Sequence, residues 1–480
     1  MNGAELKDVA LLLPELILVG TALVLLLAAH RIQKPPLAVA GTVLAALAAV
    51  VAAVWLLSCG DNPGLGETGF GEPPMIIVDG YSQFFKVLIA SALALVALLW
   101  QRRVDAENVR PAEYHALLLL ASAGMMFAAS ALDLLTLYLA LELTTLCSYI
   151  LVGITVDRPR SNEAAIKYFL LAAFASALFL YGISLTYGVT GGTDFATIAS
   201  ALGEHGVASN PLLLVAMGLL GAGLAFKIAA VPFHAWAPDA YQGASAPVAA
   251  FLATASKAAG LAALGRLCLI TFAPEEHVVS VVLTGLAVLS IVVGSITAVS
   301  QTDMKRLLAY SSIAHVGYAL LGFVSMTPEG ASATMTYVFL YVFMTLGAFG
   351  VVIALGERGE RLDGYQGLAS QRPGVALLML LFLLSLTGIP PTAGFVAKFV
   401  VILSAVSAGH VWLAVLAVLC SVVTAFVYLR VAVLMYMKEP QEPAPPRLGA
   451  AVSVALVVAA LVTLIGGILP GILTRWVVPP

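Results

Sequence analysis

Two lysines lie deep within long apolar stretches, each close to a proline that should interrupt a helix. Lys227 falls in PLLLVAMGLLGAGLAFKIAAVPFHAW, five residues before Pro232. Lys398 falls in VALLMLLFLLSLTGIPPTAGFVAKFVVILSAV, shortly after Pro390 and Pro391. A charged side chain at the centre of a bilayer costs at least about 2.5–3.5 kcal/mol, and a broken helix is tolerated at that depth only beside protein or water. The two sites therefore predict an ion path through a membrane.

A carboxylate suited to pair with the first lysine lies in another apolar stretch. Glu142 is near the middle of ALDLLTLYLALELTTLCSYILVG, and Lys227 is the obvious partner. An opposite charge nearby favours a protonated lysine, whereas desolvation disfavours it, so a lysine balanced between the two can exchange a proton when its partner moves. Arginine would stay charged and could not do this. The pair predicts a switchable proton carrier.

Further titratable side chains extend this pattern along the chain. Lys257 lies in SAPVAAFLATASKAAGLAALG, on the apolar stretch after Lys227, and His234 between them is suited to bridge the two. His315, in YSSIAHVGYALLG, occupies the corresponding part of the second half of the chain, and Lys398 ends the series. Together these residues predict a polar line at the middle of the bilayer.

Each of these residues also has a structural alternative. The glutamate and the lysines could form a static ion-pair network, although buried pairs stabilise poorly and three lysines do not balance one glutamate. The histidines could be hydrogen-bonded helix caps or packing residues. Lys167, the last residue of the segment DRPRSNEAAIK, is either a further member of the polar line or an interfacial side chain that reaches the membrane surface. We expect the same surface-seeking role for Lys86, Arg266 and Arg430.

Composition assigns the chain to the membrane. Of 480 residues, 61% are hydrophobic and only 10% are charged, whereas about one quarter is usual for soluble domains. Apolar stretches of about 20 residues indicate transmembrane helices rather than barrel strands. We predict an all-α polytopic membrane protein with about fourteen transmembrane helices. The first apolar run, from about residue 9 to residue 29, lacks the flanks of a cleavable signal peptide and is read as the first span.

The two proline sites indicate an internal repeat. Pro232 and Pro390 are 158 positions apart, with five spans from one to the other. Because five is odd, the second unit would be inverted relative to the first, an arrangement known from transporters with broken helices. We predict a three-helix flank at 1–110, a first five-helix repeat at 111–272, a second inverted repeat at 273–438, and a C-terminal helix at 439–480. The discontinuous helices would be the seventh and the twelfth. Two independent proline-containing helices are the alternative.

Loop charge predicts the orientation. Alternate loops contain fourteen of the twenty-three basic residues, and such loops face the cytoplasm. Both termini are therefore predicted on the outer side. The basic residues of these loops are Arg31, Lys34, Arg102, Arg103, Arg110, Arg158, Arg160, Lys305, Arg306, Arg358, Arg361, Arg372, Lys438 and Arg447.

Several kinds of chemistry have no sequence support. The chain has no G-x-G-x-x-G motif opening a βαβ unit and no P-loop. Its four cysteines are scattered, and no clustered Cys or His suggests an Fe–S cluster, haem or metal site. We predict no cofactor on this chain, no metal and no nucleic-acid partner, so that any redox energy must come from another subunit.

Three of these stretches resemble a known family. FKIAAVPFHAWAPDAYQGASAPVAAFLATASKAAG, QTDMKRLLAYSSIAHVGY and LTGIPPTAGFVAKF resemble the antiporter-like subunits of respiratory complex I, which are similar to subunits of Mrp-type cation/proton antiporters. The resemblance covers roughly residues 80–440. It implies fourteen helices with two inverted repeats, and a proton-translocating role in a bacterial plasma-membrane NADH–quinone oxidoreductase. FMN, Fe–S clusters and quinone would then be bound by other membrane and peripheral subunits.

The resemblance also implies roles for individual residues. Glu142 and Lys227 would form the ion pair, Lys257 would be the central connecting lysine, and Lys398 would be the proton site on the exit side. Further polar-axis positions match Lys167, His234 and His315. A lysine at position 398 and an end soon after the fourteenth span favour one branch of the family over the others. The alternatives are a Mrp-type Na⁺/H⁺ antiporter subunit, a membrane-bound hydrogenase subunit and an inert membrane scaffold.

Overall fold

The predicted all-α fold is confirmed. The computed structural model describes residues 9–30, 35–58, 74–100, 109–445 and 447–471. Within these ranges the chain is almost entirely helical, and its only extended pairings are three isolated bridges, between Ile76 and Ala131, Asp133 and Asp194, and Asp303 and Arg361.

Twelve helical segments of the described chain have the length and composition of membrane spans. They are α3 (Pro35–Ser58), α4 (Gly80–Leu99), α5 (Pro111–Ser130), α6 (Leu134–Val152), α7 (Pro159–Thr190), α9 (Pro211–Ile228), α11 to η1 (Ala246–Thr271), η2 with α13 (Ala273–Val299), α14 (Met304–Val324), α15 (Pro328–Leu355), α20 (Val411–Met437) and α21 (Ala450–Ile468).

Shorter helices complete the predicted count. Three are apolar: α2 (Leu13–Leu27), α18 (Pro373–Thr387) and α19 (Ala393–Ser407). With α2 as one crossing and α18 and α19 as halves of another, the described chain has fourteen crossings. The helices α8 (Phe195–Ser209), α10 (Trp236–Gly243), α16 (Glu357–Glu360) and α17 (Leu368–Gln371) lie in or between the connections.

The spans begin where the sequence supplies helix starts. Proline occupies the first or second position of eight of the α-helices above, where its missing N–H is not needed. Aspartates precede four others and accept hydrogen bonds from backbone N–H groups of the first turn: Asp79, Asp133, Asp194 and Asp303. Asp133 is a buried cap, and its carboxylate also accepts a hydrogen bond from the hydroxyl of Thr193.

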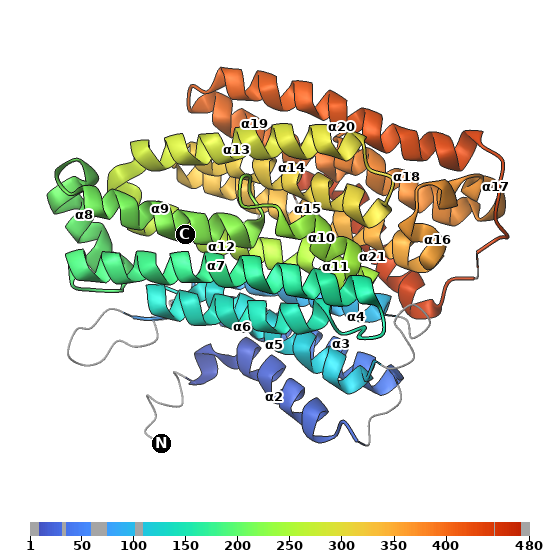
Figure 1. Ribbon diagram of the computed structural model, residues 1–480, viewed down its shortest axis with the longest axis horizontal. Coiled ribbons are helices and arrows are strands. Elements are labelled where there is room, and N and C mark those ends of the chain that lie inside the picture. The colour runs from blue at the N-terminus through green and yellow to red at the C-terminus, as the bar shows by residue number, and fades with distance from the viewer. Residues whose placement is uncertain (1–8, 31–34, 59–73, 101–108, 446, 472–480) are drawn as a thin grey trace.

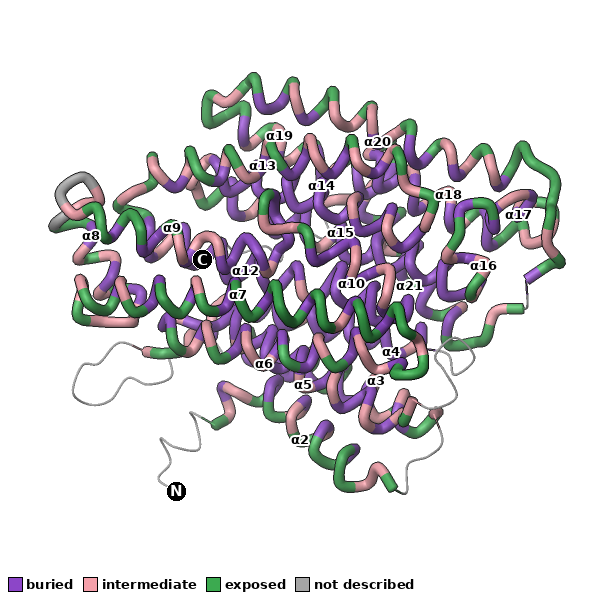
Figure 2. Tube along the Cα trace, in the orientation of Figure 1, coloured by how far each residue is buried: buried purple, intermediate pink, exposed green. Residues whose placement is uncertain are grey.

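The helices lie roughly parallel, with α8 at one end of the molecule and α16 and α17 at the other (Figure 1). The end with α16 and α17, here the basic end, also contains Arg158 and Lys305, which pair with glutamates of α16, and Arg160 and Arg306, which lie beside Asp239. The basic residues at 31, 34, 102 and 103, and those at 7 and 475, lie outside the described residues. Figure 2 shows buried residues through the middle of the molecule and exposed ones on the rim, on α2, α7 and α20.

Small residues allow the central helices to pack closely. Gly294 of α13 faces the backbone of Ala314, and Gly317 of α14 faces Ile291, so that a Cβ on either glycine would lie within 3 Å of a neighbouring atom. Small residues at such contacts are typical of helix packing in membranes. The close packing of α13 on α14 positions His315, which lies beside Gly317 and Ala314 on α14.

Candidate proton-transfer site

The predicted ion pair is present. Glu142 lies in the middle of α6 and Lys227 in the last turn of α9, and Nζ of the lysine is 3.3 Å from Oε1 of the glutamate. Nζ also donates to the hydroxyl of Thr145, one turn after Glu142 on α6. The two charged side chains are 13% and 21% exposed, so that most of each is removed from the surface.

The seventh helix breaks directly after Lys227. α9 ends at Ile228, Ala229 takes a left-handed conformation with φ of 57°, and α10 starts at Trp236. Neighbouring side chains satisfy backbone groups freed by the break: Ser290 of α13 accepts from the N–H of Val231 at 2.9 Å. The indole N–H of Trp236 donates to the carbonyl of Phe226 at 2.9 Å. The break is thus held by protein contacts, as membrane depth requires.

The central lysine binds the end of the broken helix. Lys257 is 1% exposed, and its Nζ donates to the carbonyl oxygen of Ile228, the last residue of α9, at 2.7 Å. A helix C-terminus has unpaired carbonyls and a partial negative charge, and both favour a cation there. Gly260, one turn after the lysine, faces Ile228 so closely that a Cβ would lie 2.7 Å from Cγ2 of that side chain. The position of the Lys257 ammonium therefore depends on the geometry of the break.

The twelfth helix repeats this arrangement. α18 ends at Thr387, Gly388 has a φ of 91°, and α19 starts at Ala393. Nζ of Lys398 donates to the carbonyl of Thr387 at 2.8 Å. The main-chain turn is the same in both helices. The N–H of Ile389 donates to the carbonyl of Leu384, and in the seventh helix the N–H of Ala230 donates to the carbonyl of Ala225. Two broken helices thus each present a C-terminal carbonyl to a buried lysine.

This correspondence corrects one sequence-based expectation. Because each lies close to one of the two proline sites, the predicted repeat would make Lys227 and Lys398 matching residues on matching broken helices. Lys227 lies before its break and Lys398 after its own, and the contact that matches that of Lys398 is made by Lys257. The matching ends, Ile228 and Thr387, are 159 positions apart, one more than the spacing of the prolines chosen from the sequence.

A third break lies beside Lys257 and was not predicted. α11 ends at Ala253, Thr254 has φ of −120° and ψ of −79°, and α12 (Ala255–Arg266) begins immediately afterwards. Tyr341 of α15 donates its hydroxyl to the carbonyl of Ala253 at 2.9 Å. No proline marks this break, so only the tertiary contact with the tyrosine could have indicated it.

His315 lies among tyrosines on the far side of this break. Its Nδ1 is 2.6 Å from the hydroxyl of Tyr337, and its ring centroid is 5.2 Å from that of Tyr341. The hydroxyl of Tyr318 and that of Ser421 are 2.8 Å apart.

Ser421 connects this tyrosine cluster to Lys398. Its Oγ is 3.2 Å from Nζ of Lys398, which also lies 4.5 Å from the ring centroid of Tyr318. Tyr337, Tyr341 and Ser421 were not identified from the sequence, because hydroxyls on apolar helices carry no spacing signal.

The predicted bridging role of His234 lacks a direct contact. His234 follows the break in the seventh helix, and its Nδ1 is buried without a hydrogen-bond partner in the part of the chain that the structure describes. A buried ring nitrogen of this kind is usually satisfied by water. A bridge from Lys227 to Lys257 through His234 would therefore need water.

Lys167 lies at the surface and not in the buried line. It is 48% exposed near the basic end, where its Nζ is 2.7 Å from Glu163 and 3.4 Å from Asp239. Asp239 also pairs with Arg306, at 2.6 Å. This cluster borders a polar cavity of about 190 Å³ between α7 and α10, which is lined by Arg160, Glu163, Ala164, Lys167, Asp239, Gln242 and Gly243.

A larger cavity opens at the opposite end, between the α14–α15 connection and α19. Its volume is about 690 Å³, and six hydroxyl side chains and one carboxylate line it together with apolar residues. The hydroxyls belong to Ser325, Thr327, Ser332, Thr336, Ser404 and Ser407, and the carboxylate to Glu329.

Two of the three basic side chains expected to reach the membrane surface are buried instead. Lys86 is fully buried, 2.7 Å from Glu15. Arg266 is 1% exposed and binds Asp79 through two hydrogen bonds. Arg430 donates to two carbonyls at the end of α13. All three are held by partners within the protein.

The fold and these buried charged side chains define a polytopic α-helical membrane protein. The chain belongs to the NADH:quinone oxidoreductase/Mrp antiporter transmembrane family, whose description matches residues 131–424. It is 45% identical over 456 residues to NADH-quinone oxidoreductase subunit N of Desulfovibrio desulfuricans, which covers 92% of this chain and 89% of the relative. Subunit N 2 of Rhizobium meliloti is 42% identical and covers 98% of this chain and 97% of the relative. The predicted family is therefore confirmed.

Solved structures agree with this assignment. A chain of respiratory complex I from Thermus thermophilus is 35% identical, with a TM-score of 0.82 over 96% of this chain and 98% of that one. A chain of the Mrp complex from Dietzia sp. has a TM-score of 0.85 over 99% of this chain and 96% of that one, but only 23% identity, and so shares the fold. Among the described residues, no group of three or more His, Cys, Asp or Glu side chains could hold a metal ion.

Proposed function

We propose that the chain is a proton-translocating membrane subunit of a bacterial NADH–quinone oxidoreductase. The observation that carries this proposal is the repeated contact of a buried lysine with the end of a broken helix, at Lys257 and Lys398. The first of these breaks directly follows Lys227, which is paired with Glu142. Ionisable side chains inside a membrane are costly, and they usually mark a pathway for ions or protons.

Movement of Glu142 would drive the first proton transfer. At 3.3 Å two unit charges attract each other by about 5 kcal/mol at an effective dielectric constant of about 20, and by about half as much at twice the distance. Separation of the pair would therefore make the ammonium of Lys227 a much better proton donor. Water beside the unpaired nitrogen of His234 would carry the proton towards Lys257.

Transfer onward would use the polar groups of the second half. Beyond Lys257 lie Tyr341 and His315, followed by the hydroxyl cluster that ends at Lys398. Hydroxyl and imidazole groups both donate and accept protons, so that they can relay one without holding a charge for long. Lys257 and Lys398 would be the holding sites, and the groups between them the relay.

The two polar cavities support inverted repeats at 111–272 and 273–438. α7 and α15 both begin with proline, at Pro159 and Pro328. Counted from these prolines, the four cavity residues of α7 and the four of α15 occupy the same helix positions. The matching sets are Arg160, Glu163, Ala164 and Lys167 on α7 and Glu329, Ser332, Ala333 and Thr336 on α15.

The cavities lie at opposite ends of the bundle, which suits uptake at one membrane face and release at the other. By the distribution of basic loops, the cavity with Lys167 would face the cytoplasm and the hydroxyl-lined cavity the outer side. Both termini would then lie on the outer side. We assign Lys167 to proton uptake, and Lys398 to release.

Electron transfer would take place on other subunits. FMN, Fe–S clusters and quinone belong there in this proposal, and the redox reaction would reach this chain through contacts with membrane neighbours that move Glu142. Lipid would surround the exposed apolar faces of α7, α13 and α20.

Two rival functions share part of this support. A Mrp-type Na⁺/H⁺ antiporter subunit has the same fold, but identity to the Mrp chain is only 23%, against 45% to subunit N of Desulfovibrio desulfuricans. An inert scaffold would not require three buried lysines. Co-purification with flavin and Fe–S subunits separates the first rival from our proposal, and retention of pumping after neutralisation of Lys257 and Lys398 would favour the second.

The test is Lys227→Ala in the intact complex, reconstituted in vesicles. We expect the variant to assemble and to oxidise NADH in the presence of an uncoupler, but to lose proton pumping. Lys227→Arg should also fail to pump, since arginine keeps the pairing with Glu142 but retains its proton. Pumping at the wild-type proton-to-electron ratio in both variants would overturn the assignment.

A further inference from the structure

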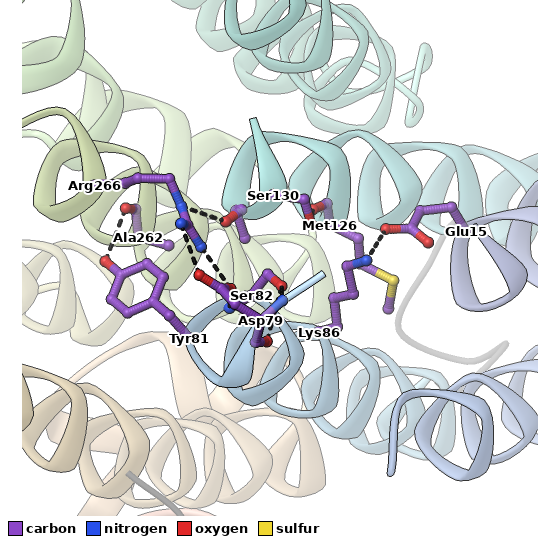
Figure 3. A network of polar contacts seen from close by, with 10 residues as sticks. Glu15, Asp79, Tyr81, Ser82, Lys86, Met126, Ser130, Ala262 and Arg266 are labelled. Atoms are coloured by element: carbon purple, nitrogen blue, oxygen red, sulfur yellow. Dashed lines mark hydrogen bonds and ion pairs between the residues drawn. The ribbon is translucent and has the colours of Figure 1, made fainter. Parts of the chain in front are cut away.

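A second buried Glu–Lys pair lies outside the line described above. Glu15, in the first turn of α2, and Lys86, in the second turn of α4, are 2.7 Å apart at Oε1 and Nζ (Figure 3). Both side chains are 0% exposed. The pair is thus closer and more deeply buried than that of Glu142 and Lys227.

The polar atoms around this pair are poorly satisfied. Apart from the ion pair, both oxygens of Glu15 and Nζ of Lys86 have no hydrogen-bond partner among the described residues. The same holds for both amide atoms of Gln83, one turn before Lys86 on the same face of α4. Buried polar groups of this kind are usually completed by water. We therefore expect a small wet site between α2, α4 and α5.

A neighbouring ion pair on α4 shows what a static contact looks like here. Asp79, at the start of α4, binds Arg266 through hydrogen bonds of 2.8 and 2.9 Å, and the guanidinium also donates to Ala129 at 3.3 Å (Figure 3). Arginine keeps its proton and forms a fixed fork. The pair seven residues later has a lysine instead, and apart from the ion pair no hydrogen bond from the described residues holds it in place.

A static role explains the second pair poorly. Removing two charges from water is expensive, and a buried pair compensates only if further hydrogen bonds satisfy its remaining atoms. No protein group among the described residues supplies those bonds at Glu15 and Lys86. Movement of one proton over the 2.7 Å contact breaks an N–H bond of Lys86, forms an O–H bond on Glu15, and leaves both groups neutral. This conversion removes the charges that make burial costly.

We propose that Glu15 and Lys86 form a second proton-exchange site in the N-terminal flank. Lys86 lies six residues into α4, about 9 Å along the axis from the helix start, and so is near the end of the bundle opposite the basic end. The neutral acid would release its proton to water at that end, and the amine would take one up from the interior. This inference rests on the proposed function, which supplies the proton flux.

The test is Lys86→Arg in the reconstituted complex. Arginine preserves an ion pair with Glu15 but cannot release its proton, so we expect assembly and uncoupled NADH oxidation to be retained and the proton-to-electron ratio to fall. Lys305→Arg is the matched control, because Lys305 is also buried and 2.9 Å from a glutamate, Glu360. A wild-type ratio for Lys86→Arg overturns the inference. Full pumping by Lys227→Ala would instead overturn the proposed function.

A measurement on the wild-type complex covers the case in which Lys86→Arg does not assemble. Apolar carbodiimides modify protonated carboxyl groups in apolar surroundings, and peptide mass spectrometry locates the product. We expect Glu15 to be modified during NADH turnover and less so at rest, with the exposed Glu276 at the start of α13 as a control that does not respond to turnover. No modification of Glu15 during turnover would show a permanently ionised, static pair and overturn the inference.

Discussion

The ammonium of Lys257 donates a 2.7 Å hydrogen bond to the carbonyl oxygen of Ile228, the residue at which the seventh helix breaks. The bond joins a lysine on one helix to the broken end of another, so that a shift of either changes the surroundings of the proton. Because Lys227 lies one residue before Ile228, the partner of Glu142 and the partner of Lys257 are adjacent in the chain. A displacement at Glu142 therefore has a short mechanical route to Lys257.

The left-handed residue after the twelfth-helix break should be intolerant of a side chain. Gly388→Ala places an L-residue at φ of 91°, at a cost of about 1–2 kcal/mol, and its Cβ would lie 2.9 Å from Cδ of Lys398. We expect both a lower unfolding temperature and reduced pumping. Gly409→Ala is the control, since Gly409 has a φ of 87° but nothing within 4 Å of a Cβ. Equal loss of pumping in the two variants would contradict a role for the Lys398 contact.

The hydroxyl of Tyr337 should matter for transfer past His315. Tyr337→Phe removes the 2.6 Å hydrogen bond to Nδ1 and leaves a buried nitrogen unpaired, at a cost of about 1–3 kcal/mol. We expect slower pumping with uncoupled NADH oxidation intact. Tyr365→Phe loses a comparable buried hydrogen bond, to Gly359 near the basic end, and should alter stability alone. Pumping that is unchanged in Tyr337→Phe would remove this tyrosine from the relay.

The two cavities should be accessible from opposite sides of the membrane. Arg160→Cys would place a thiol in the cavity between α7 and α10, and Ser407→Cys would place one in the hydroxyl-lined cavity. In a chain whose native cysteines are replaced, a membrane-impermeant thiol reagent added outside cells should label Ser407→Cys only. The same reagent should label Arg160→Cys in inside-out vesicles. Labelling of both from one side would contradict the proposed orientation.

Because of the ion pair between Asp79 and Arg266, the free energy of unfolding should depend on pH in the acid range. Burial raises the pKa of the Asp79 carboxyl. The hydrogen bonds and charge of Arg266, together with hydrogen bonds from Ser82, lower the pKa by more than burial raises it, so that it lies below its ordinary value. The stabilisation is therefore present above the unfolded pKa of about 3.9 and is lost as the pH falls through the folded one.

Asp79→Asn should test this at two pH values. At neutral pH we expect it to lower the free energy of unfolding by on the order of 2 kcal/mol, as measured by thermal unfolding in detergent, and the difference from the wild type should shrink in acid. Asp363→Asn removes a pair with Arg361 that is about 60% exposed and should change stability by less than about 1 kcal/mol. A difference for Asp79→Asn that stays constant with pH would contradict the account.

Much of this arrangement could be predicted from residue types, because charge and proline are rare in apolar helices. Glu142, Lys227 and the two proline breaks were found this way, and the ion pair is present. Glu15, the partner of Lys86, could have been found in the same way, because it is a glutamate in the first apolar run. It was missed because we expected Lys86 to lie at the membrane surface. The bend at Thr254 and the hydroxyls of Tyr337 and Ser421 could not be predicted, since they depend on contacts between helices distant in sequence. The match of Lys257 with Lys398 could not be predicted either, because it depends on where the two broken helices end and on which lysine contacts each end.

The proton-to-electron ratio of Lys257→Arg, measured in the reconstituted complex during NADH oxidation, tests the central claim most directly. Arginine can still bind the carbonyl of Ile228, but it retains its proton. We predict that the complex assembles, oxidises NADH when uncoupled, and pumps no better than Lys257→Met. Pumping by Lys257→Arg at the wild-type ratio would show that Lys257 holds the broken helix in place without carrying a proton, and would contradict the account.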